Sequence, residues 1–265
     1  MNTTVMGFNT EASNPSMPFS RILRAYIIES KYAFLSALRE PAFSIPMVAL
    51  PIFLYLLLGG VVLGPMVIDN PNASLFLFSG FLVYAVSGPG LFGLGAGLAA
   101  ERQSGVLKLK RAQPMPPAAC LIGKMVMAMC FTGIVALFLI PLAIWIGPME
   151  PTAIQIAGFM LLSILGVLPF CAIGFLIGTF VSGTAAPGII NVIFFPMLYL
   201  SGLFFPLPKV LETWAVIWPT YHLNQVAAHI AGLQSGIDIR ISIALLLGIT
   251  VVCTTLAARR FTRVG

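Results

Sequence analysis

Charged residues are absent from five long stretches of this chain, and these stretches define its hydrophobic pattern. A charged side chain at the centre of a bilayer costs about 2.5–3.5 kcal/mol on insertion scales, so the membrane-crossing helices are expected within them. One crossing takes roughly 20 apolar residues, and the fourth stretch is long enough for two, divided by a turn rich in Ser, Gly and Pro at 181–188. The charge-free stretches are 41–68, 70–100, 125–149, 151–208 and 241–258.

This pattern predicts an all-α fold, that of a polytopic membrane protein with six transmembrane helices. Backbone polar groups that face lipid must pair within a helix or a closed barrel, and the apolar stretches are too long and too weakly alternating for barrel strands. The transmembrane domain is expected over residues 41–258. Its six spans are expected at about 42–64, 75–100, 118–147, 153–181, 186–205 and 238–258.

Residues 19–40, before the first span, have the pattern of an amphipathic helix. Four basic residues, Arg21, Arg24, Lys31 and Arg39, fall away from the apolar positions, as in a helix that lies in the membrane interface. Residues 1–18 are expected to be disordered and residues 259–265 to form a basic cytosolic tail. The apolar positions at helical spacing are Leu23, Tyr26, Ile27, Phe34 and Leu38.

Composition supports a membrane location, and charge sets the orientation. The chain is 59% hydrophobic and only 8% charged, whereas soluble domains carry about 25% charged residues. With six spans, 12 of the 14 Lys and Arg residues fall on one side, and cytoplasmic loops carry an excess of these residues. A multi-pass protein of the cell (inner) membrane with both termini cytoplasmic is therefore expected. Cytoplasmic basic residues account for the net charge of +6, so no nucleic acid is expected as a partner.

The segment 206–236 follows the fifth span and has too few charges for a free loop and too many polar groups for a span. A seventh span there would place the C-terminal arginines on the opposite side from the other basic residues. A re-entrant or interfacial helical hairpin is therefore expected on the outer side of the membrane. Trp214, Trp218 and Tyr221 are suited to the headgroup level.

The sequence lacks the patterns of a catalytic or metal-binding protein. The phosphate-loop motif GxxxxGK[ST] does not occur, because Gly123 and Lys124 are followed by Met125 at the entrance of a span. His222 and His229 are seven residues apart without a carboxylate or cysteine at ligand spacing. We expect no catalytic residues, no metal and no directly bound cofactor.

Charge is dense in the loop between the second and third spans. Residues 101–113 are expected to form a short helix on the cytosolic surface, ended by Pro114, Pro116 and Pro117. A topology signal alone would explain the basic residues of this loop, but not Glu101 or Gly105.

Two stretches resemble one transporter family. ERQSGVLKLK from Glu101 to Lys110, followed by prolines and by LIGK at the start of a span, resembles the coupling-helix region of ABC transporter permeases of the type-2 exporter class. LYLSGLFFPLPKVLETWAVIWPTYHLNQVAA, from Leu198 to Ala228, resembles the segment after the fifth span of the same family. Both stretches occur in the family's order on a six-span chain.

The resemblance implies the membrane permease subunit of an ATP-driven exporter, which forms the translocation path as a homo- or heterodimer. Its partners would be a second permease subunit, membrane lipids and a separate ABC ATPase subunit, which would bind ATP and Mg and hydrolyse the ATP. The helix 101–113 would dock on that ATPase, and the segment after the fifth span would form an external lid. The implied docking residues are Glu101, Arg102, Gly105, Leu107, Lys108, Leu109 and Arg111, and the implied lid residues are Phe204, Phe205, Pro206, Trp214, Trp218, Pro219 and Tyr221.

Four polar residues within the spans are candidates for the substrate path, although hydrogen bonding between helices would explain each of them too. They are Tyr84, Ser87, Asn191 and Tyr199. An autonomous secondary transporter would normally show buried ionisable residues and related halves, which this sequence lacks. A non-transporting assembly or sensor scaffold on the same fold is a further alternative.

Overall fold

The computed structural model describes residues 18–64, 70–111, 116, 118–205, 207–233 and 236–264. All regular elements in these ranges are helices, which confirms the all-α prediction. Five of the described helices are long and apolar enough to cross a membrane, as the polytopic prediction requires. These are Pro41–Val62, Pro71–Gln103, Ala119–Ile146, Ala153–Phe180 and Ile239–Phe261.

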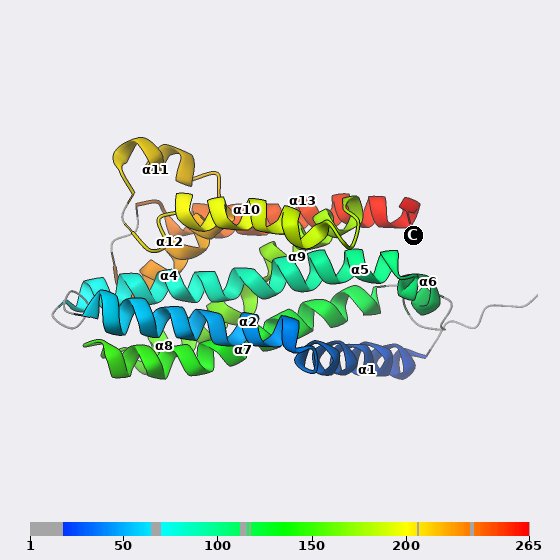
Figure 1. Ribbon diagram of the computed structural model, residues 1–265, viewed down its shortest axis with the longest axis horizontal. Helices are drawn as coiled ribbons and strands as arrows, with labels where there is room; N and C mark the ends of the chain where they lie inside the picture. The colour runs from blue at the N-terminus through cyan, green and yellow to red at the C-terminus, as the bar shows by residue number, and fades with distance from the viewer. Residues whose placement is uncertain are drawn as a thin grey trace, which may run out of the picture.

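The long helices lie side by side along the longest axis of the molecule (Figure 1). Several are built from consecutive elements, and two of them contain a π-helical stretch. In chain order, the elements of the bundle are α2 (Pro41–Tyr55), η1 (Leu56–Val62), α4 (Pro71–Gly90), η2 (Leu91–Ala96), α5 (Gly97–Gln103), α7 (Ala119–Ile146), α8 (Ala153–Leu165), α9 (Leu168–Phe180), α10 (Ala186–Leu200) and α13 (Ile239–Val264).

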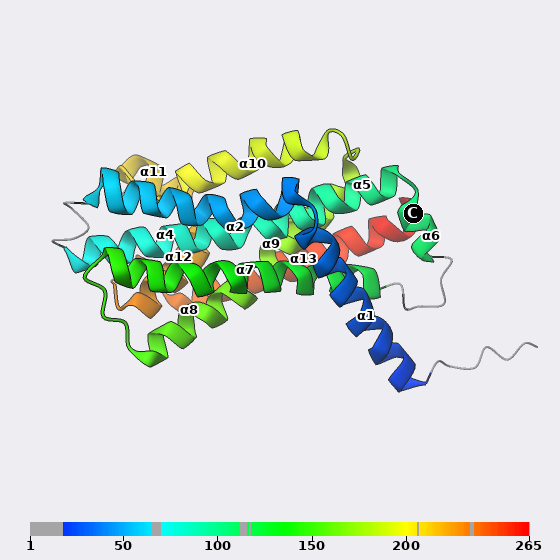
Figure 2. The ribbon, with the colours of Figure 1, turned by 60° about the horizontal axis from the view of Figure 1, so that its bottom comes forward.

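Four further helices lie at the two ends of the bundle, and they give it a direction. Helix α6, helix α1 and the C-terminus share one end, and α11 lies at the opposite end (Figure 1). Helix α1 leaves the bundle at an oblique angle (Figure 2) and packs mainly on α7. These helices are α1 (Phe19–Leu38), α6 (Val106–Arg111), α11 (Lys209–Ala215) and α12 (Pro219–Ala231).

Helix bounds differ from the expected spans in three places. The second crossing is longer than expected, because α4, η2 and α5 run without a break from Pro71 to Gln103. Helix α10 ends at Leu200 rather than near 205, because the chain turns at Gly202, whose φ of +67° is in the left-handed region. With 15 residues, α10 is only about 22 Å long. Helix α13 continues to Val264, so most of the expected tail 259–265 is helical.

Local sequence accounts for several helix ends. The Asn70 side chain accepts hydrogen bonds from the amides of Asn72 and Ala73 at the start of α4. Thr152 and Gln155 form a reciprocal capping box at the start of α8. Between α8 and α9 the helix is interrupted at Gly166, three residues before Pro169, which has no amide hydrogen to continue the hydrogen bonding of the helix.

The second crossing lies at the centre of the bundle, and glycine allows it to approach α9 closely. A Cβ atom on Gly174 of α9 would lie 2.7 Å from the carbonyl oxygen of Gly90, and one on Gly178 would lie 2.8 Å from that of Gly95. Side chains at these positions would therefore separate η2 from α9. Gly93 of η2 faces Met127 of α7 instead.

Candidate coupling site at the basic end of the bundle

The charged loop between the second and third crossings forms two helical pieces rather than the single helix expected over 101–113. Glu101 belongs to α5, the end of the second crossing, and α6 begins only at Val106. Gly105 separates them with a φ of +79°, a conformation that costs little only for glycine. Its carbonyl accepts hydrogen bonds from the amides of Lys108 and Leu109, which start α6. The turn places α6 across the end of the bundle (Figure 1).

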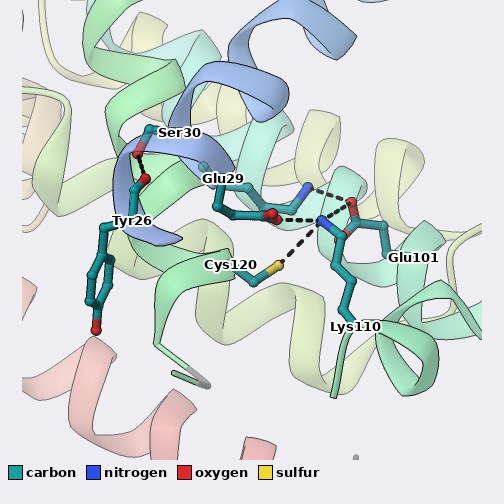
Figure 3. A network of polar contacts seen from close by, with 7 residues as sticks. Tyr26, Glu29, Ser30, Glu101, Lys110 and Cys120 are labelled. Carbon is teal, nitrogen blue, oxygen red and sulfur yellow. Dashed lines mark hydrogen bonds and ion pairs between the residues drawn. The ribbon is translucent and has the colours of Figure 1, made fainter. Parts of the chain in front are cut away.

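Four charged side chains from four helices form one ion-pair network at this end (Figure 3). Lys110 Nζ of α6 lies 2.7 Å from Glu29 Oε1 of α1 and 3.7 Å from Glu101 Oε1 of α5. The same Glu101 oxygen lies 3.1 Å from Lys124 Nζ of α7. The network therefore connects α6 to α1 directly and to α7 through Glu101.

The network is largely shielded from solvent. The exposed fraction of the side chains is 16% for Glu29, 24% for Glu101, 25% for Lys110 and 11% for Lys124. Burial lowers the pKa of Lys110, but its hydrogen bond with Glu29 and the charge of Glu101 outweigh burial, so the pKa is raised above the ordinary value. Lys110 is therefore charged at neutral pH. Breaking a shielded pair costs more than breaking an exposed one, because the remaining charge is left without a partner.

Arg102, the neighbour of Glu101, points to the end of α9. Its Nη1 donates to the carbonyl oxygen of Thr179, and its Nη2 donates to that of Val181 at 2.7 Å. Arg260 of α13 also donates to the Thr179 carbonyl, at 3.3 Å, and its guanidinium lies 3.6 Å from the centroid of the Phe180 ring. The last carbonyls of a helix have no partner within it, and cations stabilise this negative end. Two arginines therefore tie α5 and α13 to α9.

Only some of the seven implied docking residues are exposed and available to a partner. Glu101 and Arg102 are engaged inside the chain, and Leu107 is buried. Lys108 is exposed, and Leu109 has 70% of its surface exposed, so these two form the free face of α6. The side chain of Arg111 lies outside the described part of the structure.

Two of the four substrate-path candidates belong to an aromatic cluster with Phe194 and Phe204. The Tyr84 ring lies 5.9 Å from that of Phe194 and 6.1 Å from that of Phe204, and the Tyr199 ring lies 6.3 Å from Phe204. Phe204, an implied lid residue, therefore joins two path candidates. Ser87 is buried, and its hydroxyl donates to the carbonyl of Tyr84 in its own helix. Asn191 is half-buried on α10.

The remaining lid candidates fall into exposed and anchored groups. Phe205 and Trp214 are exposed, Trp218 and Tyr221 are half-buried, and Pro219 is buried at the start of α12. Pro206 lies outside the described residues.

Helix α12 packs against α4 and α13 at the end of the bundle opposite α6 (Figure 1). Thr220 Oγ1 donates to the carbonyl of Met197 on α10 at 3.0 Å. The ring of His222 lies 2.8 Å from the Val216 carbonyl and 3.2 Å from the Ser242 hydroxyl. His229 is exposed. In the described part of the chain no group of three possible metal-ligating side chains occurs.

Two of the residues that build this site were missed by sequence reasoning. Glu29 is an acid within a basic helix, and that contrast is the signal that could have marked it. Arg260 looked like part of a topology-setting tail. Lys124, at the entrance of the third crossing, is buried and paired with Glu101.

Comparison with known families gives one match. The family model for the ABC-2 type transporter matches residues 24–237, a range that contains the ion-pair network, α6, the aromatic cluster and α12. A comparison with curated proteins gives no match. Since the matched range covers most of the chain, this multi-pass membrane protein belongs to the ABC-2 type transporter family, and it is a permease component of an ABC transporter rather than the ATPase itself.

Proposed function

We propose that this chain is the membrane subunit of an ATP-driven exporter. Two such subunits, identical or paralogous, would enclose a central path, and separate ATPase subunits would bind ATP and Mg and dock on the α6 end. Family membership supports an ATPase partner. The observation that carries the docking proposal is the free face of α6, where an apolar and a basic side chain, Leu109 and Lys108, are exposed at the end of the bundle.

The orientation follows from where the basic residues lie. Lys108, Lys110 and the C-terminal arginines share the end that also carries α1, and an excess of Lys and Arg marks the cytoplasmic side. With α10 as a short sixth crossing between this end and α11, both termini would be cytoplasmic.

The contacts behind α6 offer a route for the force of ATP-driven closure. A push on α6 would reach α1 and α7 through the ion pairs of Lys110 and Glu101. The same movement of α5 would reach α9 and α13 through the carbonyl end that Arg102 and Arg260 share. Charged contacts therefore tie α1 and three helices of the bundle, α7, α9 and α13, to the docking segment.

The aromatic cluster supports an apolar translocation path that the outer segment closes. Tyr84, Phe194, Tyr199 and Phe204 place aromatic rings where α4 and α10 meet the chain that leads to α11. Aromatic walls favour lipophilic cargo, such as lipophilic drugs, lipids or lipid-linked glycans.

The test is assembly with the ATPase. The chain is co-expressed with a candidate ABC ATPase from the same genome, and the ATPase that copurifies and the ATP hydrolysis that the chain stimulates are measured. Leu109→Glu should abolish both, because it places an acid on the docking face. Val210→Glu is the matched control, since Val210 is 79% exposed on α11 at the other end. Normal assembly of Leu109→Glu would refute docking through α6.

A further inference from the structure

An open apolar groove lies between α1 and α7, beside the ion-pair network. It has a volume of about 560 Å³ and is lined by Tyr26, Ile27 and Ser30 of α1 and by Ile122 and Val126 of α7. Ile27 has 60% of its surface exposed and Ile122 has 40%. Apolar side chains exposed at the start of a membrane-crossing helix favour contact with lipid.

Two cations lie on the same face of α1 as Ile27, one of the residues that line the groove. Arg24 and Lys31 lie three residues before and four residues after Ile27, so they share its face of α1. Both are exposed, and neither forms an ion pair with a charged residue in the described ranges. The acid between them in sequence, Glu29, faces the other way and is paired with Lys110. The positive charge at the groove is therefore not neutralised by that acid.

We propose that this groove binds one anionic phospholipid from the leaflet that borders the α6 end. An acyl chain would lie against Tyr26, Ile27 and Ile122, and the phosphate would accept hydrogen bonds from Arg24 and Lys31. A zwitterionic lipid would fill the same groove with less electrostatic gain. The bound lipid would contact α1, and α1 holds α6 through the ion pair between Glu29 and Lys110. Lipid composition would therefore influence the docking segment.

The first test measures lipid binding by the purified full chain, without an ATPase, so it is independent of the export proposal. Native mass spectrometry counts phosphatidylglycerol and phosphatidylcholine retained from mixed bilayers. Each cation near an anionic surface favours it by about fivefold, so Arg24→Gln/Lys31→Gln should weaken the preference for phosphatidylglycerol roughly 30-fold. The matched control, Arg21→Gln/Arg39→Gln, also removes two charges from α1, but at positions that do not share the face of Ile27. Equal losses in both double variants would overturn the proposal.

The second test maps the site in the unmodified chain. Phosphatidylglycerol with a photoactivatable group on its acyl chain should cross-link to peptides that contain 26–30 and 122–126, and Ile122→Trp, which fills the groove, should suppress these cross-links. Cross-links confined to other helices, or cross-links unchanged in Ile122→Trp, would overturn the assignment. So would protection of both peptides by a bound ATPase in lipid-free detergent, since the groove would then be a protein interface.

Discussion

Removal of the ion pair between Glu29 and Lys110 should loosen α1 from the bundle. The two charged atoms lie 2.7 Å apart, and the side chains are only 16% and 25% exposed. A hydrogen bond to a charged group contributes about 1.5–3 kcal/mol, and the partial contact with solvent reduces this to about 1–2 kcal/mol. Because 1.4 kcal/mol changes an equilibrium tenfold, the amides of α1 should exchange about 5–30 times faster in Glu29→Gln.

The assay is hydrogen exchange with mass spectrometry on the full chain in lipid nanodiscs. Peptides from α12 serve as an internal control, because this helix is anchored at the opposite end. Glu29→Gln, Lys110→Gln and the double variant complete a double-mutant cycle. The cycle separates this pair from the contacts of Lys110 with Glu101 and Cys120. Exchange of α1 that changes less than twofold in Glu29→Gln, or single effects that simply add, would refute the role of this pair.

Three further predictions concern the same end of the bundle. Arg102→Gln should lower the melting temperature by several degrees, because the Val181 carbonyl loses a charged partner that contributes about 1–3 kcal/mol, whereas Arg240→Gln at an exposed site should not. Gly105→Val should reduce stimulation of the ATPase and Gly105→Asn should retain it, since no atom lies within 4 Å of a Cβ there and only the backbone conformation, about 1–2 kcal/mol for valine, is affected. Because the pKa of Lys110 is raised in the folded chain, its contribution is complete below the unfolded value of 10.5 and declines only above it. The difference in α1 protection between the wild type and Lys110→Gln should therefore stay constant from pH 7 to about pH 10, and a decline within that range would contradict the network.

The membrane-crossing segments were predictable because hydrophobicity is a local property. The absence of charge over stretches such as 125–149 predicts a crossing whatever its neighbours are, and α7 lies there. The helix over 19–40 was predictable in the same way, from spacing alone. The end of α10 was not, because the left-handed turn at Gly202 depends on the chain that follows.

The charged site could be located from the sequence, but the pairing of its side chains could not be predicted. Lys110 and Glu29 are 81 residues apart, and no pattern within either segment selects the other. Arg102 lies in the segment that resembles a docking helix, yet its guanidinium donates hydrogen bonds to the carbonyls at the end of α9. Pairings of this kind depend on how helices pack, and hydrophobic periodicity specifies only which face of a helix is apolar.

The shortness of α10 has a consequence for the surrounding bilayer. As the sixth crossing proposed above, a helix of about 22 Å in a hydrocarbon layer of about 30 Å would leave roughly 8 Å unmatched. Lipids beside α10 would have to compress, at a fraction of a kcal/mol for each Å. The mismatch would be smallest in thin membranes, and chains reconstituted into lipids with long acyl tails would be under strain along this one side.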